Sequence, residues 1–134
     1  MLGPRKEKFR KQFRGKRRGV ALRGSTIAFG EFGLKALSTG WVSAREIEAA
    51  RKKITFMTKR AGKYWVRVFP HKPITKKAVG VKMGSGKGAV EEHVAVIKPG
   101  TILFELSGVT QEIAEQAFSK AGHKLSVKTM LVQK

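Results

Sequence analysis

The strongest hydrophobic periodicity in the chain lies between Ser43 and Gly62, where apolar residues recur every three or four positions. This spacing predicts an α-helix with one apolar stripe, made of Ile47, Ala50, Ile54, Met57 and Ala61. Ser43 and Glu46 form an S-x-x-E capping box, and Gly62 is the expected stop. A second stripe predicts a helix that Thr110 caps and Gly122 ends, with a buried face of Ile113, Ala114, Ala117, Phe118 and Ala121.

Alternating or continuous apolar runs between and around these helices predict β-strands. Residues 26–37 have an extended pattern that is interrupted at Gly30 and Gly33, and residues 64–69 alternate between two faces. The stretch HVAVIKPGTILFELSGV predicts two strands joined by a Pro-Gly turn, and SVKTMLVQ predicts a last strand. Elements in this order indicate an α+β fold, sandwich-like, with two helices packed on a largely antiparallel sheet.

Charge adds to this picture because it is large and unevenly distributed. The 134 residues carry 29 Lys and Arg against nine acids, all of them Glu, for a net charge of +20. Residues 1–24 hold ten bases and one acid, residues 25–90 fourteen bases and three acids, and residues 91–134 five of each. A positive field of this size attracts polyanions through counterion release. We therefore expect nucleic acid to face the first two thirds of the chain.

These patterns divide the chain into a basic N-terminal arm, residues 1–24, and a single α+β domain, residues 25–134, which includes the projecting loop 80–90 and which we expect to bind nucleic acid. The arm is rich in bases and has no broad apolar face, so we expect it to order only on a polyanion. It shares its Arg-rich, acid-poor character with organelle transit peptides but lacks their Ser residues. Phe9 and Phe13 either stack on bases or dock onto the core, and the sequence leaves both open.

Two further basic features lie within the domain. The outer surface of the first helix carries Arg45, Arg51, Lys52, Lys53, Lys59 and Arg60, which we expect to extend the footprint of the arm on RNA or DNA. The second is Arg67, which stands between Trp65 and Phe69 on one face of residues 64–69. An arginine there stacks on bases or grips phosphate, or else it extends over half-buried aromatic rings with its charge in solvent.

The Gly-rich segment 80–90, GVKMGSGKGAV, is expected to project as a loop. It fails the Walker pattern because Val81 stands at the first Gly position and Gly88 at the Ser/Thr position. It matches the dinucleotide pattern G-x-G-x-x-A, but the residues that follow predict a strand instead of the required helix. One interpretation is a flexible backbone that approaches RNA closely, with Lys82 and Lys87 adding charge. The other is a surface hairpin whose lysines serve solubility.

The sequence assembles no catalytic or metal site. It contains neither Cys nor Asp, so disulfides, thiolate ligands and Asp-based triads are excluded. His71, His93 and His123 are far apart, and adjacent residues such as Glu92 and His93 point to opposite faces of a strand. No apolar run reaches the roughly 20 residues of a membrane span. We expect a binding protein with no cofactor, no metal, no small-molecule substrate and no membrane partner.

Several long strings, found in order from end to end, carry a family resemblance. With x for positions that do not carry the resemblance, they are M-L-x-P-R-K followed by F-R-K and G-x-x-x-G, F-G-x-F-G-L-K-A, A-R-x-I-E-A-A-R, W-V-R-V-F-P-x-K-P-I-T, M-G-S-G-K-G, K-P-G-x-I-L-F-E and A-F-x-x-A-x-x-K-L. Together they closely resemble family sixteen of the large-subunit ribosomal proteins of bacteria and organelles. The set is far more specific than any single glycine motif.

The resemblance implies a structural protein that binds large-subunit ribosomal RNA near the A site, contacts tRNA there or in the P site, and touches neighbouring ribosomal proteins. It also implies late entry into subunit assembly, support of the peptidyl-transferase region, and a cytoplasmic ribosome, with an organellar one as the alternative. The residues expected to bind ribosomal RNA are Arg5, Lys6, Lys8, Arg10, Lys11, Arg14, Lys16, Arg17, Arg18, Arg23, Arg45, Arg51, Lys52, Lys59, Arg60 and Arg67. The loop expected to face tRNA and the functional core comprises Lys82, Met83, Gly84, Ser85, Gly86, Lys87 and Gly88.

The chain departs from the family pattern at a few positions. Lys82 stands where Arg is common, so the hydroxylation that some bacteria place on that Arg does not carry over. His71 replaces an Asp, and an aromatic pair after the loop is missing.

Two rival hypotheses are a nucleotide-dependent enzyme, which titration with ATP, GTP and NAD would detect, and a DNA-compacting protein, which competition between duplex DNA and ribosomal RNA would detect.

Overall fold

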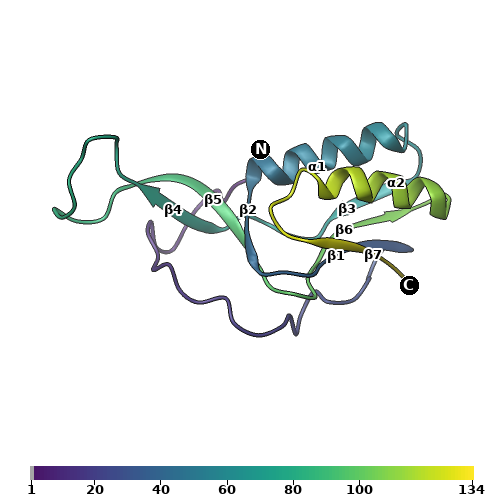
Figure 1. Cartoon of the computed structure of the whole chain (residues 1–134), viewed down its shortest axis with the longest axis horizontal. Coiled ribbons are helices and arrows are strands. Elements are labelled where there is room, and N and C mark those ends of the chain that lie inside the picture. Colours follow the sequence, from purple (N-terminus) through teal and green to yellow (C-terminus); the bar gives the residue numbers. More distant parts are fainter. Residues whose placement is uncertain (1) are drawn as a thin grey trace.

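The computed structural model describes residues 2–134 and has an α+β architecture, which confirms the predicted fold class (Figure 1). The elements are β1 (Phe32–Ala36), β2 (Gly40–Ser43), α1 (Ala44–Met57), β3 (Lys63–Val66), β4 (Lys72–Lys76), β5 (Ala89–Ile97), β6 (Ile102–Ser107), α2 (Gln111–Gly122) and β7 (Thr129–Gln133). The two helices lie side by side, and the β4–β5 hairpin extends away from them (Figure 1).

The strands form two antiparallel sheets, where the sequence predicted one. The four-stranded sheet has the order β3-β6-β1-β7 and the three-stranded sheet has the order β2-β5-β4. β5 and β6 are joined at the predicted Pro-Gly turn but belong to different sheets. The reason is that the turn is bonded to the end of β1, by Gly100 N–H to Ala36 O and by Ala36 N–H to Thr101 O, both at 2.8 Å. β6 therefore leaves the turn along β1 and does not fold back on β5.

The main core lies between the two helices and the strands. α1 buries Ile47, Ala50 and Ile54, and α2 buries Ala114, Ala117, Phe118 and Ala121. These stripes pack on buried strand residues that include Phe32, Leu34, Val42, Ile97, Phe104 and Leu106. The apolar stripes predicted for both helices thus hold the helices to the sheets, since burial of apolar surface is the main driving force.

Both helices begin where their caps predict. The Glu46 N–H donates to Ser43 Oγ at 3.2 Å, and the Ile113 N–H donates to Thr110 Oγ1 at 3.3 Å. The carboxylate of Glu46 accepts from the Ser126 N–H at 2.9 Å, so it ties α1 to the segment before β7.

The predicted end of the first helix at Gly62 is wrong. α1 ends at Met57, and Thr58 Oγ1 donates back to Ile54 O at 3.0 Å. Lys59 and Arg60 then take positive φ angles of 53° and 62°, which a right-handed helix cannot continue. Ala61 consequently lies outside the helix and is exposed.

Two predicted strands are shorter than expected. Residues 26–31 form no strand, and β1 starts at Phe32. β3 stops at Val66, although Val66 and Val68 both pack against the core.

Candidate nucleic-acid interface

The arm has no helix or strand in its described part, residues 2–24, yet it follows a defined path along the three-stranded sheet and the turn after β5 (Figure 1). Its anchoring contacts are Glu7 to His93 at 2.5 Å, Phe13 O to Lys72 Nζ at 2.8 Å, Ala21 N to Pro99 O at 2.9 Å and Gly24 O to Ile102 N at 2.8 Å. That the arm orders only on a polyanion stays a prediction.

The aromatic side chains of the arm do not dock onto the core. Phe9 is 64% exposed and Phe13 is 91% exposed. Stacking on nucleobases, the other interpretation that the sequence left open, stays a prediction.

The arm presents positive charge without acidic partners. Eight of its ten bases are exposed, and Lys11 and Arg17 are half-buried. The three ion pairs found within residues 2–134 join Arg51 to Glu48, Arg67 to Glu105 and His93 to Glu7. Since Glu7 is the only acid of the arm and pairs with His93, none of the ten bases is neutralised by a carboxylate in the described chain.

Trp41, in β2, holds part of the arm and was not recognised from the sequence. The guanidinium carbons of Arg14 and Arg17 lie 5.2 and 4.9 Å from the centroid of its ring, and Lys72 Nζ lies 6.0 Å from it. All three are within the range of cation–π attraction. We call Trp41, Arg14, Arg17 and Lys72 the Trp41 cluster. Its members come from three segments that the sequence pattern does not connect.

Exposed basic residues also lie on the outer surface of α1 and in the turn that follows it. Arg45, Lys52, Lys59 and Arg60 are exposed, and Phe56 beside them is 72% exposed. A surface with basic side chains and an exposed aromatic ring suits RNA, because Lys and Arg side chains donate hydrogen bonds to phosphates and the ring stacks on nucleobases.

Arg51 lies on the same surface but has an internal partner. Its guanidinium donates to both carboxylate oxygens of Glu48 and, at 3.4 Å, to Tyr64 Oη. These bonds, that to Glu48 first, raise the pKa of Arg51, and the bond to Arg51 lowers the pKa of Glu48. Arg51 therefore stays charged, but part of its hydrogen-bonding capacity is already used.

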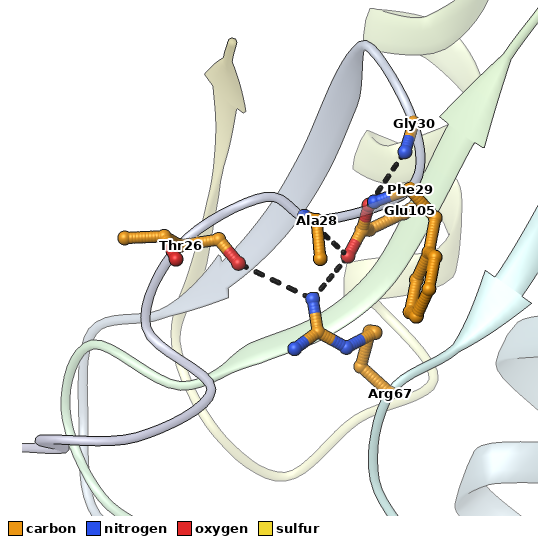
Figure 2. Close-up of polar contacts among 6 residues, drawn as sticks. All are labelled: Thr26, Ala28, Phe29, Gly30, Arg67 and Glu105. Carbon is orange, nitrogen blue, oxygen red and sulfur yellow. Dashed lines mark hydrogen bonds and ion pairs between the residues drawn. The ribbon is translucent and has the colours of Figure 1, made fainter.

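Glu105, in β6, fastens the segment between the arm and β1 to the body (Figure 2). Its side chain is fully buried, and four donors converge on it. Oε1 accepts from the N–H groups of Phe29 and Gly30, both at 2.7 Å. Oε2 accepts from the Ala28 N–H at 3.2 Å and from Arg67. Burial by itself would raise the pKa of Glu105, but these bonds outweigh burial and the net pKa is lowered.

Arg67 is directed into this cluster. Its guanidinium donates to Glu105 and, at 3.2 Å, to Thr26 O, and lies 5.4 Å from the centroid of the Phe29 ring (Figure 2). Phe29 stacks in turn on Trp65, with ring centroids 6.0 Å apart. Arg67 thus has internal partners, and we leave it out of the proposed RNA contacts. The only sequence signal for this arrangement was a lone acid in the apolar run ILFELS.

The glycine-rich loop connects β4 to β5 and lies at the end of the hairpin farthest from the helices (Figure 1). Gly80, Gly84, Ser85 and Gly86 have positive φ angles, and Met83 is 95% exposed. Because the loop joins two antiparallel strands, no helix follows it to complete a dinucleotide site.

The two lysines of the loop differ in their contacts. Both are exposed, but Lys87 Nζ donates to Gln12 O at 2.5 Å and Lys87 O accepts from Lys11 Nζ at 3.1 Å. Lys87 therefore links the base of the loop to the arm, and Lys82 is the loop lysine that is open to an external partner.

Other kinds of site have no support in the described residues. Within residues 2–134 no group of three His, Cys, Asp or Glu side chains is placed to hold a metal ion. Neither described helix has the length and apolar character to cross a membrane.

An α+β domain with unpaired cations along an arm and a helix, and an exposed glycine loop, defines an RNA-binding protein. The chain belongs to the ribosomal protein L16p/L10e family, whose family model matches residues 4–132. It is therefore a structural protein of the large ribosomal subunit, and this family is not one of enzymes. Its partners are ribosomal RNA and neighbouring ribosomal proteins. The match to the family model confirms the family resemblance found in the sequence.

Proposed function

We propose that the protein grips large-subunit ribosomal RNA with its arm and the outer surface of α1, and extends the β4–β5 loop toward tRNA near the A site. In this role it supports late subunit assembly and the region around the peptidyl-transferase centre. The observation that carries the RNA contacts is the arm, whose ten bases have no carboxylate partner in the described chain. Positive charges without internal partners are free to replace the counterions of RNA.

The position of the loop supports the second part of the proposal. It lies away from the helices (Figure 1), exposes Met83 and Lys82, and has a glycine backbone that can approach another molecule closely. The arm and the loop are linked through Lys87 and Gln12, so RNA bound to the arm also fixes the base of the loop.

Binding to purified large-subunit ribosomal RNA is expected to fall steeply with salt. Each phosphate neutralised contributes about −0.7 to −0.9 to the slope of log affinity against log salt concentration. With roughly six to ten phosphate contacts, affinity falls about 10³- to 10⁵-fold between 50 and 200 mM salt. Filter binding over a salt series measures this slope. A shallow slope would contradict the proposed binding of RNA through phosphate contacts.

Paired substitutions locate the contacts. Lys6→Gln with Lys8→Gln removes two exposed arm charges, and is expected to reduce the magnitude of the slope by about 1.4 to 1.8. The matched control, Lys124→Gln with Lys128→Gln, removes the same charge from exposed positions in the neutral last third. An equal change of the salt slope in both double variants would mean that RNA binding depends only on the net charge of the protein.

Reversing the charge of Lys82 tests the loop. Lys82→Glu is expected to leave incorporation into the subunit unchanged but to lower the rate of translation about tenfold, since like charges then meet at the loop. Lys87→Glu is expected to reduce both the incorporation into the subunit and the rate of translation, because Lys87 is bonded to the arm. Sucrose gradients measure incorporation, and a translation assay with the same particles measures rate. Normal translation with Lys82→Glu would refute the contact with tRNA.

A further inference from the structure

The Trp41 cluster has an incomplete charge balance. Its three cationic groups lie within 6.0 Å of one ring centroid, so any two of them are at most about 11 Å apart, near the Debye length of about 10 Å at 0.1 M salt. Their mutual repulsion is therefore only partly screened. None of the ion pairs within residues 2–134 involves them. An aromatic face attracts cations but carries no net charge, so it leaves all three charges uncompensated.

The indole nitrogen of Trp41 is a second, independent observation. Nε1 is buried and has no hydrogen-bond acceptor among the described residues, and it is the single buried side-chain N or O atom there of which this is true. Buried Trp N–H groups normally find a partner. The cluster thus contains three positive charges, from which phosphate oxygens accept hydrogen bonds, and beside them an N–H donor that has no partner among the described residues.

The space beside the ring limits the size of a ligand. Trp41, Arg14 and Lys72 line a cavity of about 120 Å³ together with Gln12, Lys87 and residues 73–75. A water molecule takes up about 30 Å³ in the liquid, so the cavity holds about four groups of that size. This volume accommodates a phosphate group.

We propose that the Trp41 cluster binds one phosphate group of an RNA backbone, and that this phosphate fastens the arm to the three-stranded sheet. The inference rests on the proposed RNA-binding function and adds Trp41 and Lys72 to its residues. Arg14 and Arg17 belong to the arm, whereas Trp41 and Lys72 belong to β2 and β4. A phosphate has enough acceptor oxygens to bond both groups at once, and arginine meets it with two parallel donors. RNA therefore stabilises the path of the arm that the isolated chain already has.

The first test compares Lys72→Gln with Lys124→Gln, an exposed lysine of the neutral last third. Lys72→Gln is expected to weaken binding of purified large-subunit ribosomal RNA about tenfold at 0.1 M salt and to reduce the slope by about 0.7 to 0.9. Lys124→Gln is expected to stay within about twofold of wild type and to leave the slope unchanged. Equal affinities and slopes for the two variants would overturn the proposal.

Substitutions of Trp41 separate the ring from its donor. Trp41→Leu removes both and is expected to weaken RNA binding about tenfold, whereas Trp41→Phe keeps a ring and is expected to weaken it about threefold. Wild-type affinity for both variants would overturn the proposal. If these variants fail to fold by circular dichroism, the Lys72→Gln comparison still decides, because Lys72 lies on an edge strand.

Fluorescence reports on the cluster directly. The chain has two tryptophans, so Trp65→Phe leaves Trp41 as its only indole. Addition of ribosomal RNA at constant ionic strength is expected to change the fluorescence emission of Trp41 until the binding sites are saturated. An unchanged emission would overturn the proposal. Inorganic phosphate at millimolar concentration is expected to have little effect. Saturation by inorganic phosphate with no further response to RNA would identify a free-phosphate site and overturn the assignment to the backbone.

The outcomes also separate this inference from the proposed function. If the wild-type protein binds RNA with a steep salt dependence while the Lys72 and Trp41 variants bind equally well, the cluster is not a phosphate site and the proposed function stands. If the wild-type protein itself shows a shallow salt dependence, the proposed grip on RNA fails and the inference fails with it.

Discussion

Replacing Glu105 by Gln is expected to lower the free energy of unfolding by about 3 kcal/mol at pH 7. Every partner of the carboxylate is a donor, namely three backbone N–H groups and Arg67. A Gln amide presents an NH₂ group to some of these donors and has no negative charge for the guanidinium. Urea denaturation followed by circular dichroism measures the loss. Glu48→Gln is the matched control, because it also loses a bond to Arg but at the surface, and no measurable loss is expected there.

The effect of Glu105 is expected to depend on pH. Its pKa in the folded protein lies below the ordinary value of 4.5, so its contribution to stability is fully present above about pH 4.5. This contribution is lost as the pH falls through the lowered pKa, because the carboxylate then takes up a proton. Wild type and Glu105→Gln should therefore differ most at pH 7, and the difference should shrink as the pH falls below about 4.5. A difference that stays constant over this range would contradict the role assigned to the charge.

Replacing Gly62 by Ala is expected to cost about 3 kcal/mol of stability, since two penalties add. Gly62 has a φ of +70°, a conformation that an L side chain rarely adopts. A Cβ at this position would also lie 2.1 Å from the carbonyl oxygen of Ser107, so the backbone between β3 and β6 would have to move. Thermal or urea unfolding of the variant measures the loss.

Gly80→Ala isolates the penalty of the backbone angle. Gly80 has a similar φ of +88°, but nothing lies within 4 Å of a Cβ placed there. We expect a loss of about 1 kcal/mol from strain alone. Equal losses at Gly62 and Gly80 would mean that the contact with Ser107 costs nothing.

The helices were predictable because their signals are local. The caps at Ser43 and Thr110 are confirmed, and so are the buried stripes with the exception of Ala61, since each depends on residues within one or two turns. The division into two sheets was not predictable, because it depends on pairings between distant segments, such as Phe32 with Gln133. The end of α1 was missed because non-glycine residues, Lys59 and Arg60, take the left-handed conformation.

The candidate interface was likewise predictable only where its signals are local in the sequence. Charge counts along the sequence identified the arm and the outer surface of α1 as basic, and these residues are mostly exposed. The internal partner of Arg67 could not be found, because Glu105 lies 38 positions away and the fold alone brings them together. Trp41 had no sequence signal either, since its neighbours Arg14, Arg17 and Lys72 come from other segments.

The pairing of β1 with β7 has a consequence for the order of events during synthesis. Phe32 pairs with Gln133, so β1 has only β6 and β7 as neighbours in its sheet and both are translated much later. Closing so long a loop is slow, and chains emerge at about 5 to 20 residues per second. The basic arm precedes all of these strands and leaves the translating ribosome before them. For several seconds, therefore, the basic arm of a nascent chain is available while the body that will hold that arm in place does not yet exist.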